Sequence, residues 1–287
     1  MKLRRTAALG LAAILAATSL TSCGRGAADK DAIQLGTTEA DMGYWKVFEQ
    51  EAEKAGVKIQ TKQFADYQTP NRALNDKEVD ANLFQHLKFL AQHNAGSGNN
   101  LVAIGSTQIV PLALYWKDHT SLDGIEGQEV ALPNDPSNQG RAINVLKQAG
   151  LVTLKTEGLI TPTPADVDTA ASKVKIVPVD SAQTATVYKE GKPAIVNNTF
   201  LERANIDAKT AIFKDDPNSP EAEPYINVIA VRQEDVNNEK IAKLVEVYHS
   251  EPVQKALAED SKGTSVEVKR SKEDLNKILE RLQNNQK

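Results

Sequence analysis

Apolar positions recur along the chain at two alternating spacings, which predict strands and helices in turn. Residues 32–36 form a short apolar run of the kind found in a buried strand. Trp45, Phe48 and Ala52 then recur at the three- and four-residue spacing of one helical face, and Gly56 follows as a C-cap. The chain therefore begins its folded part with a strand and a helix.

The same alternation continues to the C-terminus. Further strands are predicted at 57–61, 101–104, 109–116, 129–133, 174–179 and 194–196. Helical stripes are predicted at 142–149, 241–248 and 275–282, the last behind a capping-box-like Ser271 and Asp274, while 161–164 and 214–223 look like surface connections. This order is typical of an α/β fold with helices on both faces of a sheet.

The N-terminal segment has the pattern of an export signal. Basic residues precede an Ala/Leu-rich run at 7–17, which is too short to span a bilayer. The run ends in Leu-Thr-Ser-Cys23, which resembles the bacterial lipobox, so 1–22 are expected to be a signal peptide, Cys23 a lipidated residue and 23–31 a flexible tether. Two acyl chains would give a stable membrane anchor. An ordinary cleaved signal with an incidental cysteine is the alternative.

Composition narrows the class of partner. The chain has 287 residues, a formal net charge of -4 and 25% charged residues, without a basic patch that would suit a nucleic acid. No second apolar stretch is long enough for a membrane span, so the rest of the chain is expected to be soluble. The length is sufficient for two lobes of ordinary domain size.

Common catalytic and metal-binding motifs are absent from the sequence. It contains no G-x-S-x-G, G-x-x-x-x-G-K-[ST], G-x-G-x-x-G or H-E-x-x-H segment. Its four histidines are not paired with other ligands at a local metal-site spacing. We therefore predict a protein that is not an enzyme and has no cofactor and no metal, with a lipid-anchored envelope hydrolase or an adhesin as lower alternatives.

Residues 134–141, NDPSNQGR, follow a predicted strand and enter a predicted helix. If the helix begins near Ser137 or Asn138, Arg141 lies in its first turn, where the helix dipole disfavours a cation. An anion would resolve that conflict, because backbone N–H groups and a guanidinium can share one carboxylate. Arg141 is thus a candidate anchor for a solute carboxylate, unless it points to solvent or pairs with Asp135.

Four further segments carry a resemblance to a known family: 67–71 (YQTPN), 80–86 (DANLFQH), 194–199 (AIVNNT) and 224–229 (PYINVI). Together with 134–141, they resemble the NlpA-type lipoproteins, whose best-known members are methionine-binding proteins of ABC importers. The resemblance runs in register from Gly36 into the C-terminal helices.

The resemblance implies a two-lobed periplasmic-binding-protein fold of type 2, with the chain crossing between the lobes twice. Lobe one would comprise 32–112 and 228–287, and lobe two 113–227. It also implies an exported protein, lipid-anchored at the cell envelope, that captures methionine or a close derivative and delivers it to the membrane subunits of an ABC importer. Another hydrophobic amino acid or a small peptide is the alternative ligand.

Carried over residue by residue, the resemblance implies that Arg141 holds the ligand's α-carboxylate and that Asn197 and Asn227 orient its α-amino and carboxylate groups. Both asparagines would lie at strand ends that face a crevice, where open α/β sheets bind ligands. The alternative for each is a turn asparagine that caps its own backbone.

Aromatic side chains are implied as the walls of the ligand's side-chain pocket, namely Tyr67, Phe84, His86 and Phe89. A thioether suits such walls, because sulfur makes favourable contacts with aromatic rings. Ordinary core packing is the alternative role. The sequence departs from the family's commoner pattern at Phe89 and Phe200, where tyrosine is expected, so two pocket hydroxyls are absent.

Overall fold

The computed structural model of the chain describes residues 31–285. The expected signal peptide, Cys23 and all of the tether before residue 31 lie outside the described residues. Within the described part, no helix has both the length and the apolar character needed to cross a bilayer.

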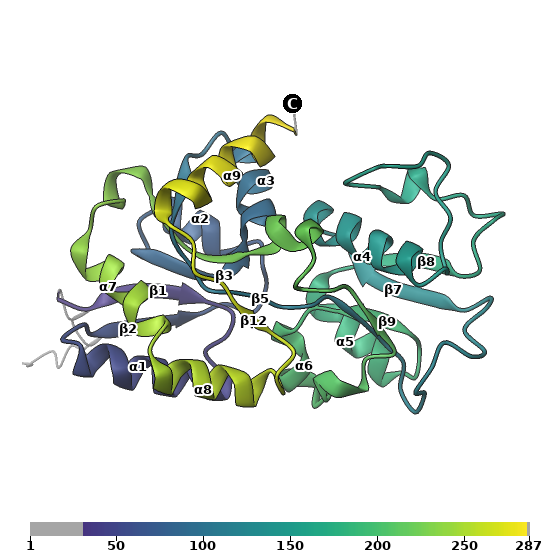
Figure 1. The fold of residues 1–287 in the computed structure, drawn as a ribbon, viewed down its shortest axis with the longest axis horizontal. Helices are drawn as coiled ribbons and strands as arrows, with labels where there is room; N and C mark the ends of the chain where they lie inside the picture. Colours follow the sequence, from purple (N-terminus) through teal and green to yellow (C-terminus); the bar gives the residue numbers. More distant parts are fainter. Residues whose placement is uncertain (1–30, 286–287) are drawn as a thin grey trace, which may run out of the picture. The chain divides into compact units, whose positions relative to one another are not determined.

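The first lobe contains a five-stranded mixed sheet (Figure 1). Four of its strands come from the N-terminal part of the chain and one from the C-terminal part, and the C-terminal helices pack on it. Its strand order is β2-β1-β3-β11-β4, in which β11 is antiparallel to its neighbours β3 and β4 and the other pairs are parallel. The strands are β1 (Ile33–Thr37), β2 (Ile59–Gln63), β3 (Ala81–His86), β4 (Leu101–Ser106) and β11 (Asn227–Arg232). Because β11 runs backwards, it begins at the edge where the parallel strands end.

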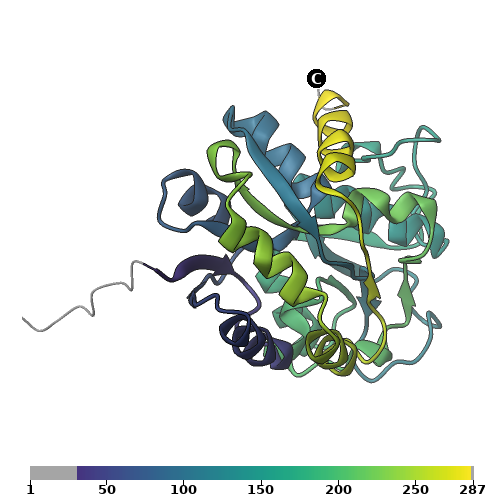
Figure 2. The ribbon, with the colours of Figure 1, turned by 60° about the vertical axis from the view of Figure 1, so that its left-hand side comes forward.

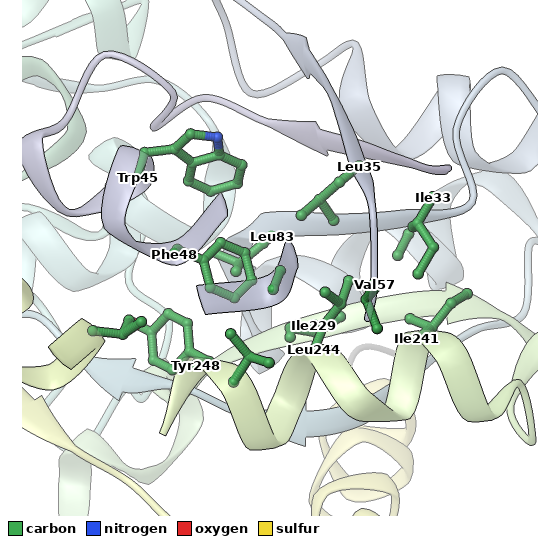
Figure 3. Packing of buried hydrophobic residues seen from close by; sticks show 14 of the residues in the cluster. Ile33, Leu35, Trp45, Phe48, Val57, Leu83, Ile229, Ile241, Leu244 and Tyr248 are labelled. Carbon is green, nitrogen blue, oxygen red and sulfur yellow. The ribbon is translucent and has the colours of Figure 1, made fainter. Parts of the chain in front are cut away.

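Helices cover both faces of this first sheet, which explains why the four middle residues of β11, 228–231, are all apolar and buried. Ile229 and Val231 pack with α1 (Gly43–Lys54), α7 (Glu239–Tyr248) and α8 (Glu251–Asp260), which lie on one side (Figure 2). Figure 3 shows Ile241, Leu244 and Tyr248 of α7 gathered with Phe48 and the strand side chains. Val228 and Ala230 pack with α2 (Pro70–Asn75), α3 (Leu87–Ser97) and α9 (Lys272–Asn284) on the other side. A strand buried on both faces has no polar side to present.

A second five-stranded sheet has the order β10-β6-β9-β7-β8. Its strands are β6 (Ala113–Tyr115), β7 (Glu129–Pro133), β8 (Lys175–Val179), β9 (Ala194–Val196) and β10 (Phe213–Lys214). Val130 and Leu132 face the core that α4 (Pro136–Gln148) covers, whereas Ala131 faces the core of α5 (Ser181–Lys189) and α6 (Thr199–Ala204). Period-two alternation thus divides this lobe into two cores.

The chain passes between the sheets twice, as expected for the two-lobed α/β fold. Residues 110–112 lead from the first lobe into β6, and residues 215–226 return from β10 to β11. At the crossing the two segments bond to each other, since Asp215 N donates to Leu112 O at 3.2 Å. By contacts, the described residues belong to one compact unit. The division into domains at 112/113 and 227/228 therefore stays a proposal.

Two strand predictions were inaccurate. The run at 109–116 is not one strand: β5 (Gln108–Ile109) pairs with β12 (Val266–Glu267), and β6 belongs to the second sheet. Pro111, which cannot donate to a sheet ladder, lies in the break. The strand predicted at 57–61 begins two residues later, at Ile59. Val57 instead packs as a buried side chain against the apolar residues of α1.

Gly105 of β4 tests the packing of α7 on the first sheet. A Cβ at this position would lie 2.4 and 2.5 Å from the two γ-carbons of Val245. Gly105→Ala should therefore lower the free energy of unfolding by about 1–3 kcal/mol, because a β-branched neighbour cannot rotate away easily. Urea denaturation measures this loss, and adding Val245→Ala should recover part of it.

Gly96 of α3 is the matched control, because a Cβ there meets nothing within 4 Å. Gly96→Ala should leave stability unchanged or raise it by up to about 1 kcal/mol. Equal losses for both alanine variants would contradict the proposed packing of β4 against α7.

Candidate functional site

One cavity lies between the two lobes, and all seven ligand-binding residues expected from the sequence line it. They are Tyr67, Phe84, His86, Phe89, Arg141, Asn197 and Asn227. The cavity leaves about 50 Å³ for the centres of water-sized groups. A single water needs about 10–15 Å³ on this measure, so the space suits a small solute.

The side chain of Arg141 is held by a carboxylate and a backbone carbonyl, and not by groups at the start of its helix. Helix α4 begins at Pro136 with Asp135 as its N-cap, and this places Arg141 in the second turn, beyond the expected first turn. The guanidinium neither points to solvent nor pairs with Asp135. Its Nε donates to Asp215 Oδ2 at 2.6 Å, and Nη2 donates to Asp215 Oδ1 at 3.2 Å and to Val110 O at 2.9 Å.

Both crossover segments contribute to this arginine site. Val110 belongs to the first crossover and Asp215 to the second, and Asp215 Oδ1 also accepts from Leu112 N at 2.8 Å. The ring of Tyr225 lies under the guanidinium, with Cζ 4.1 Å from its centroid. The remaining nitrogen, Nη1, takes no part in these bonds. Arg141 therefore keeps donor capacity at a cavity where its charge is already balanced.

A relay of amides fixes the polar wall of the cavity. Asp135 accepts from the backbone N of Asn138 at 2.9 Å and from its Nδ2 at 3.1 Å, which orients the Asn138 side chain. Asn138 Oδ1 in turn accepts from Asn197 Nδ2 at 3.1 Å and lies 3.3 Å from His86 Nε2. The N-cap of α4 thus orients side chains from β3 and from the end of β9.

His86 is neutral and its tautomer follows from its partners. Burial, with the positive charge of Arg141 as the next cause, lowers the pKa of His86 to about 3. Its Nδ1 accepts from Phe89 N at 3.1 Å, so the proton resides on Nε2, which donates to Asn138. Both ring nitrogens are therefore engaged in holding the wall.

The two asparagines expected to orient a ligand differ in their bonding. Asn197 directly follows β9, and its Oδ1 is buried without a hydrogen-bond partner among the described residues. Asn227 begins β11 rather than ending a strand, yet it reaches the same edge because β11 is antiparallel and pairs Asn227 with His86. Its Nδ2 donates to Gln108 O at 3.2 Å. Asn197 thus presents an unused acceptor to the cavity.

Aromatic rings form the opposite wall. The ring of Tyr67 lies 6.1 Å from Phe84, 6.0 Å from Phe89 and 5.2 Å from Phe200 between centroids. Tyr67 and Phe84 belong to the buried cluster that also contains Phe200 and other side chains of the second lobe. The aromatic wall is therefore made jointly by both lobes.

Sequence reasoning missed three polar groups of this site. Asn138 lay within a segment that was singled out, but it was given no role. Asp215 was assigned to a surface connection, whereas its side chain is only 16% exposed. Glu39, after β1, lines the cavity and accepts from Tyr44 Oη at 2.5 Å. Burial raises the pKa of Glu39 to about 7. Only the position of Glu39 two residues after the end of β1 could have pointed to it.

The lobes are also joined beside the cavity. Arg203 of α6 donates from Nε to Asp41 Oδ2 at 2.7 Å and from Nη2 to Thr38 O at 2.5 Å.

No metal site is formed by the described residues, since none of their groups of three or more His, Cys, Asp and Glu side chains is placed to hold a metal ion.

Comparisons with known proteins identify the family and the fold. A family model described as NlpA lipoprotein matches residues 33–269. The D-methionine-binding lipoprotein MetQ of Escherichia coli strain K12 is 33% identical over 271 residues, which cover 92% of this chain and 98% of MetQ. Protein PG110 of Staphylococcus aureus has a crystal structure with a TM-score of 0.81 and 36% identity, covering 87% of this chain and 99% of that one. A nutrient-binding protein from Burkholderia cenocepacia, solved bound to methionine, has a TM-score of 0.75 and 34% identity over 82% of this chain and 99% of its own.

The Arg141–Asp215 pair should be essential to stability. The side chains are 6% and 16% exposed, so Asp215→Ala leaves a buried guanidinium without its counter-charge. We expect a loss of about 3–5 kcal/mol in the free energy of unfolding, measured with chemical denaturant. Glu78→Ala is the control, because its pair with Lys62 is exposed on both sides and its loss should change stability far less. Similar small losses for both variants would refute a structural role for the buried pair.

Proposed function

The chain belongs to the NlpA lipoprotein family, and on that premise we propose that it captures methionine between its lobes and delivers it to the membrane subunits of an ABC importer. The relatives named above support methionine as the ligand, since one is named for D-methionine and another was solved bound to methionine. The cavity described here supplies the physical argument for this chain.

The observation that carries the proposal is an unused donor and an unused acceptor at one small cavity. Arg141 retains Nη1 for a carboxylate, and Asn197 Oδ1 can accept from an ammonium group. Asp215 already neutralises Arg141, so a zwitterion enters without adding net charge to a buried site. In this role Arg141 holds the α-carboxylate, while Asn197 and Asn227 orient the α-amino and carboxylate groups.

The aromatic wall accounts for the ligand's tail. Tyr67, Phe84 and Phe89 enclose the cavity with their rings, and His86 closes it toward the polar wall. Sulfur beside an aromatic ring gains about 0.3–1.5 kcal/mol per contact, and methionine requires no hydrogen bond for its tail. Another hydrophobic amino acid meets the same requirements and stays the alternative ligand, whereas a peptide demands more space than the cavity leaves.

Closure of the lobes over the ligand supplies the signal for delivery. The bonds of Arg203 to Thr38 and Asp41 and the bond between His86 and Asn138 join the two lobes in this structure. A ligand that contacts Arg141 and Asn197 on one lobe and His86 on the other favours the closed state by contacts made only there. The importer then distinguishes loaded from empty protein by shape.

A hydrolase is less consistent with the same cavity. Its imidazole, His86, uses both nitrogens for Phe89 N and Asn138, so it is not directed at the hydroxyl of Thr199 in the lining. A nucleophile and a base within hydrogen-bond reach are the minimum for that chemistry. We therefore propose binding without catalysis.

Methionine binding can be measured by calorimetry after the protein is unfolded and refolded to remove retained ligand. Arg141→Ala should weaken binding at least about 30-fold, because loss of a buried charge-assisted contact costs about 2–5 kcal/mol. Asn197→Ala should weaken it about 5- to 150-fold by removing the free acceptor. The second variant matters because Arg141→Ala also leaves Asp215 unpaired.

Arg270→Ala is the matched control, since this arginine is exposed and is not among the residues that line the cavity. It should bind methionine as the parent does. If folded Arg141→Ala and Asn197→Ala proteins bind methionine with the affinity of the parent, the assigned site is wrong. If the parent does not bind methionine, the proposed ligand is wrong.

We also propose that Cys23 is lipidated and anchors the exported protein at the cell envelope, a role that rests on the lipobox-like residues before it. Labelled palmitate should be incorporated into the parent protein in a bacterial host and should be absent from Cys23→Ala. The variant should then fractionate with soluble proteins. Membrane retention of unlabelled Cys23→Ala protein would show that another feature anchors the chain.

A further inference from the structure

The carboxyl of Glu39 is the unexplained feature of the cavity. Of the residues that line it, Glu39 is the acid, and neither the zwitterion clamp nor the aromatic wall requires one. Its Oε2 accepts from Tyr44 Oη at 2.5 Å, which fixes the group at the start of α1. A polar group held in place at a ligand cavity has a role in what the cavity accepts.

Glu39 lies on the tail side of the cavity. The charges that act on it are Asp41 and Arg203, and Arg203 also lies 5.5 Å from the ring centroid of Phe200. Phe200 packs on Tyr67, and Glu39 in turn raises the pKa of Tyr67. Arg203 also donates to the carbonyl of Thr38, the residue before Glu39, so these contacts place Glu39 beside the aromatic end of the cavity.

We propose that Glu39 is a further ligand-selecting residue, whose carboxyl must be protonated when an apolar tail fills the aromatic end, so that capture of such amino acids is coupled to proton uptake. This inference rests on the proposed function. An apolar tail removes water from the carboxyl, and desolvation disfavours its ionised form. A protonated Glu39 can remain beside the tail, whereas an ionised one loses its hydration.

The sign of the coupling follows from the free protein. Burial already raises the pKa of Glu39 to about 7, and an apolar tail raises it further. Binding therefore takes up a proton between the two pKa values, and affinity falls as pH rises through that window. Below about pH 6 the carboxyl is protonated in both states and the affinity should be constant.

Neighbouring groups do not produce the same effect near neutral pH. Arg203 keeps its charge, and burial raises the pKa of the three tyrosines that interact with Glu39, so these stay neutral. Asp260 of α8 reaches the site only through Tyr44 N, at 2.6 Å. The remaining groups around the carboxyl are Tyr44, Tyr67, Tyr248, Asp41 and Arg203.

Lys88 is a competing source of pH dependence among the residues that the structure describes. It is buried on α3 beside Tyr225, outside the cavity lining, and burial with the nearby Arg141 lowers its pKa to about 8. Loss of its charge would also weaken the binding of a carboxylate as pH rises. A variant at this position therefore separates the two origins.

Calorimetric titration of methionine at pH 6 and pH 8 tests the inference, with each pH run in two buffers of different ionisation enthalpy to count protons. The parent should bind about five- to tenfold more weakly at pH 8 and take up about half a proton near pH 7.5. Glu39→Gln, which keeps an acceptor for Tyr44, should show equal affinity at both pH values and no uptake. Lys88→Gln should keep the ratio of the parent.

Norleucine, which has an apolar tail without sulfur, should give the same ratio as methionine, because the coupling arises from excluded water. Methionine binding with a flat pH profile, or a profile lost in Lys88→Gln and kept in Glu39→Gln, would overturn the inference while leaving the proposed function intact. Failure of methionine to bind at either pH would overturn both.

Discussion

The buried pair of Arg141 and Asp215 is the interaction on which the site depends. A guanidinium keeps its charge at any ordinary pH, so its burial requires a fixed counter-charge and saturated hydrogen bonds. Asp215 supplies the charge, Val110 a carbonyl and Tyr225 a ring face. These partners come from the two segments that cross between the lobes. One side chain of the second lobe therefore ties both connections together, and the position of the proposed ligand anchor is inseparable from the position of the two crossover segments.

The neutrality of that pair determines which solutes the cavity suits. A lone arginine would favour any small anion, but an arginine already matched by a carboxylate favours a ligand that carries both charges. The acceptor that we propose for the ligand's positive end depends on a different part of the fold. The N-cap residue Asp135 orients Asn138, and Asn138 occupies Asn197 Nδ2, which leaves Asn197 Oδ1 free. The capping of α4 by Asp135 thus determines, through Asn138, the orientation of the Asn197 amide at the end of β9.

The sequence predicts the general alternation of strands and helices, because buried strands and one-sided helices leave apolar patterns. It did not predict β3 and β11 as strands, although both lie inside the first sheet. Family motifs also located seven side chains that share one cavity. The partners of those side chains were not predictable in the same way. Asp215 lies 74 positions from Arg141 in a polar loop, and no local spacing marks it as buried. The break between β5 and β6 was missed since Val110, Pro111 and Leu112 continue an apolar run while the chain changes sheets. Burial of these residues follows from the crossing, which is a long-range property.

The two ends of the cavity differ in whether their ionisable groups change protonation near neutral pH. At the polar end, Arg141 is compensated, and His86 is held neutral with both nitrogens bonded, so neither group changes state near neutral pH. At the aromatic end, Glu39 is bonded to a tyrosine hydroxyl, and the nearest cation, Arg203, is already engaged by Asp41. In the proposed role, recognition of the zwitterion would be insensitive to the protonation of the polar end, whereas the environment of the tail would depend on the protonation of Glu39. The carboxyl lies just after β1 on one lobe and the guanidinium lies on α4 of the other, and both line one cavity in this structure.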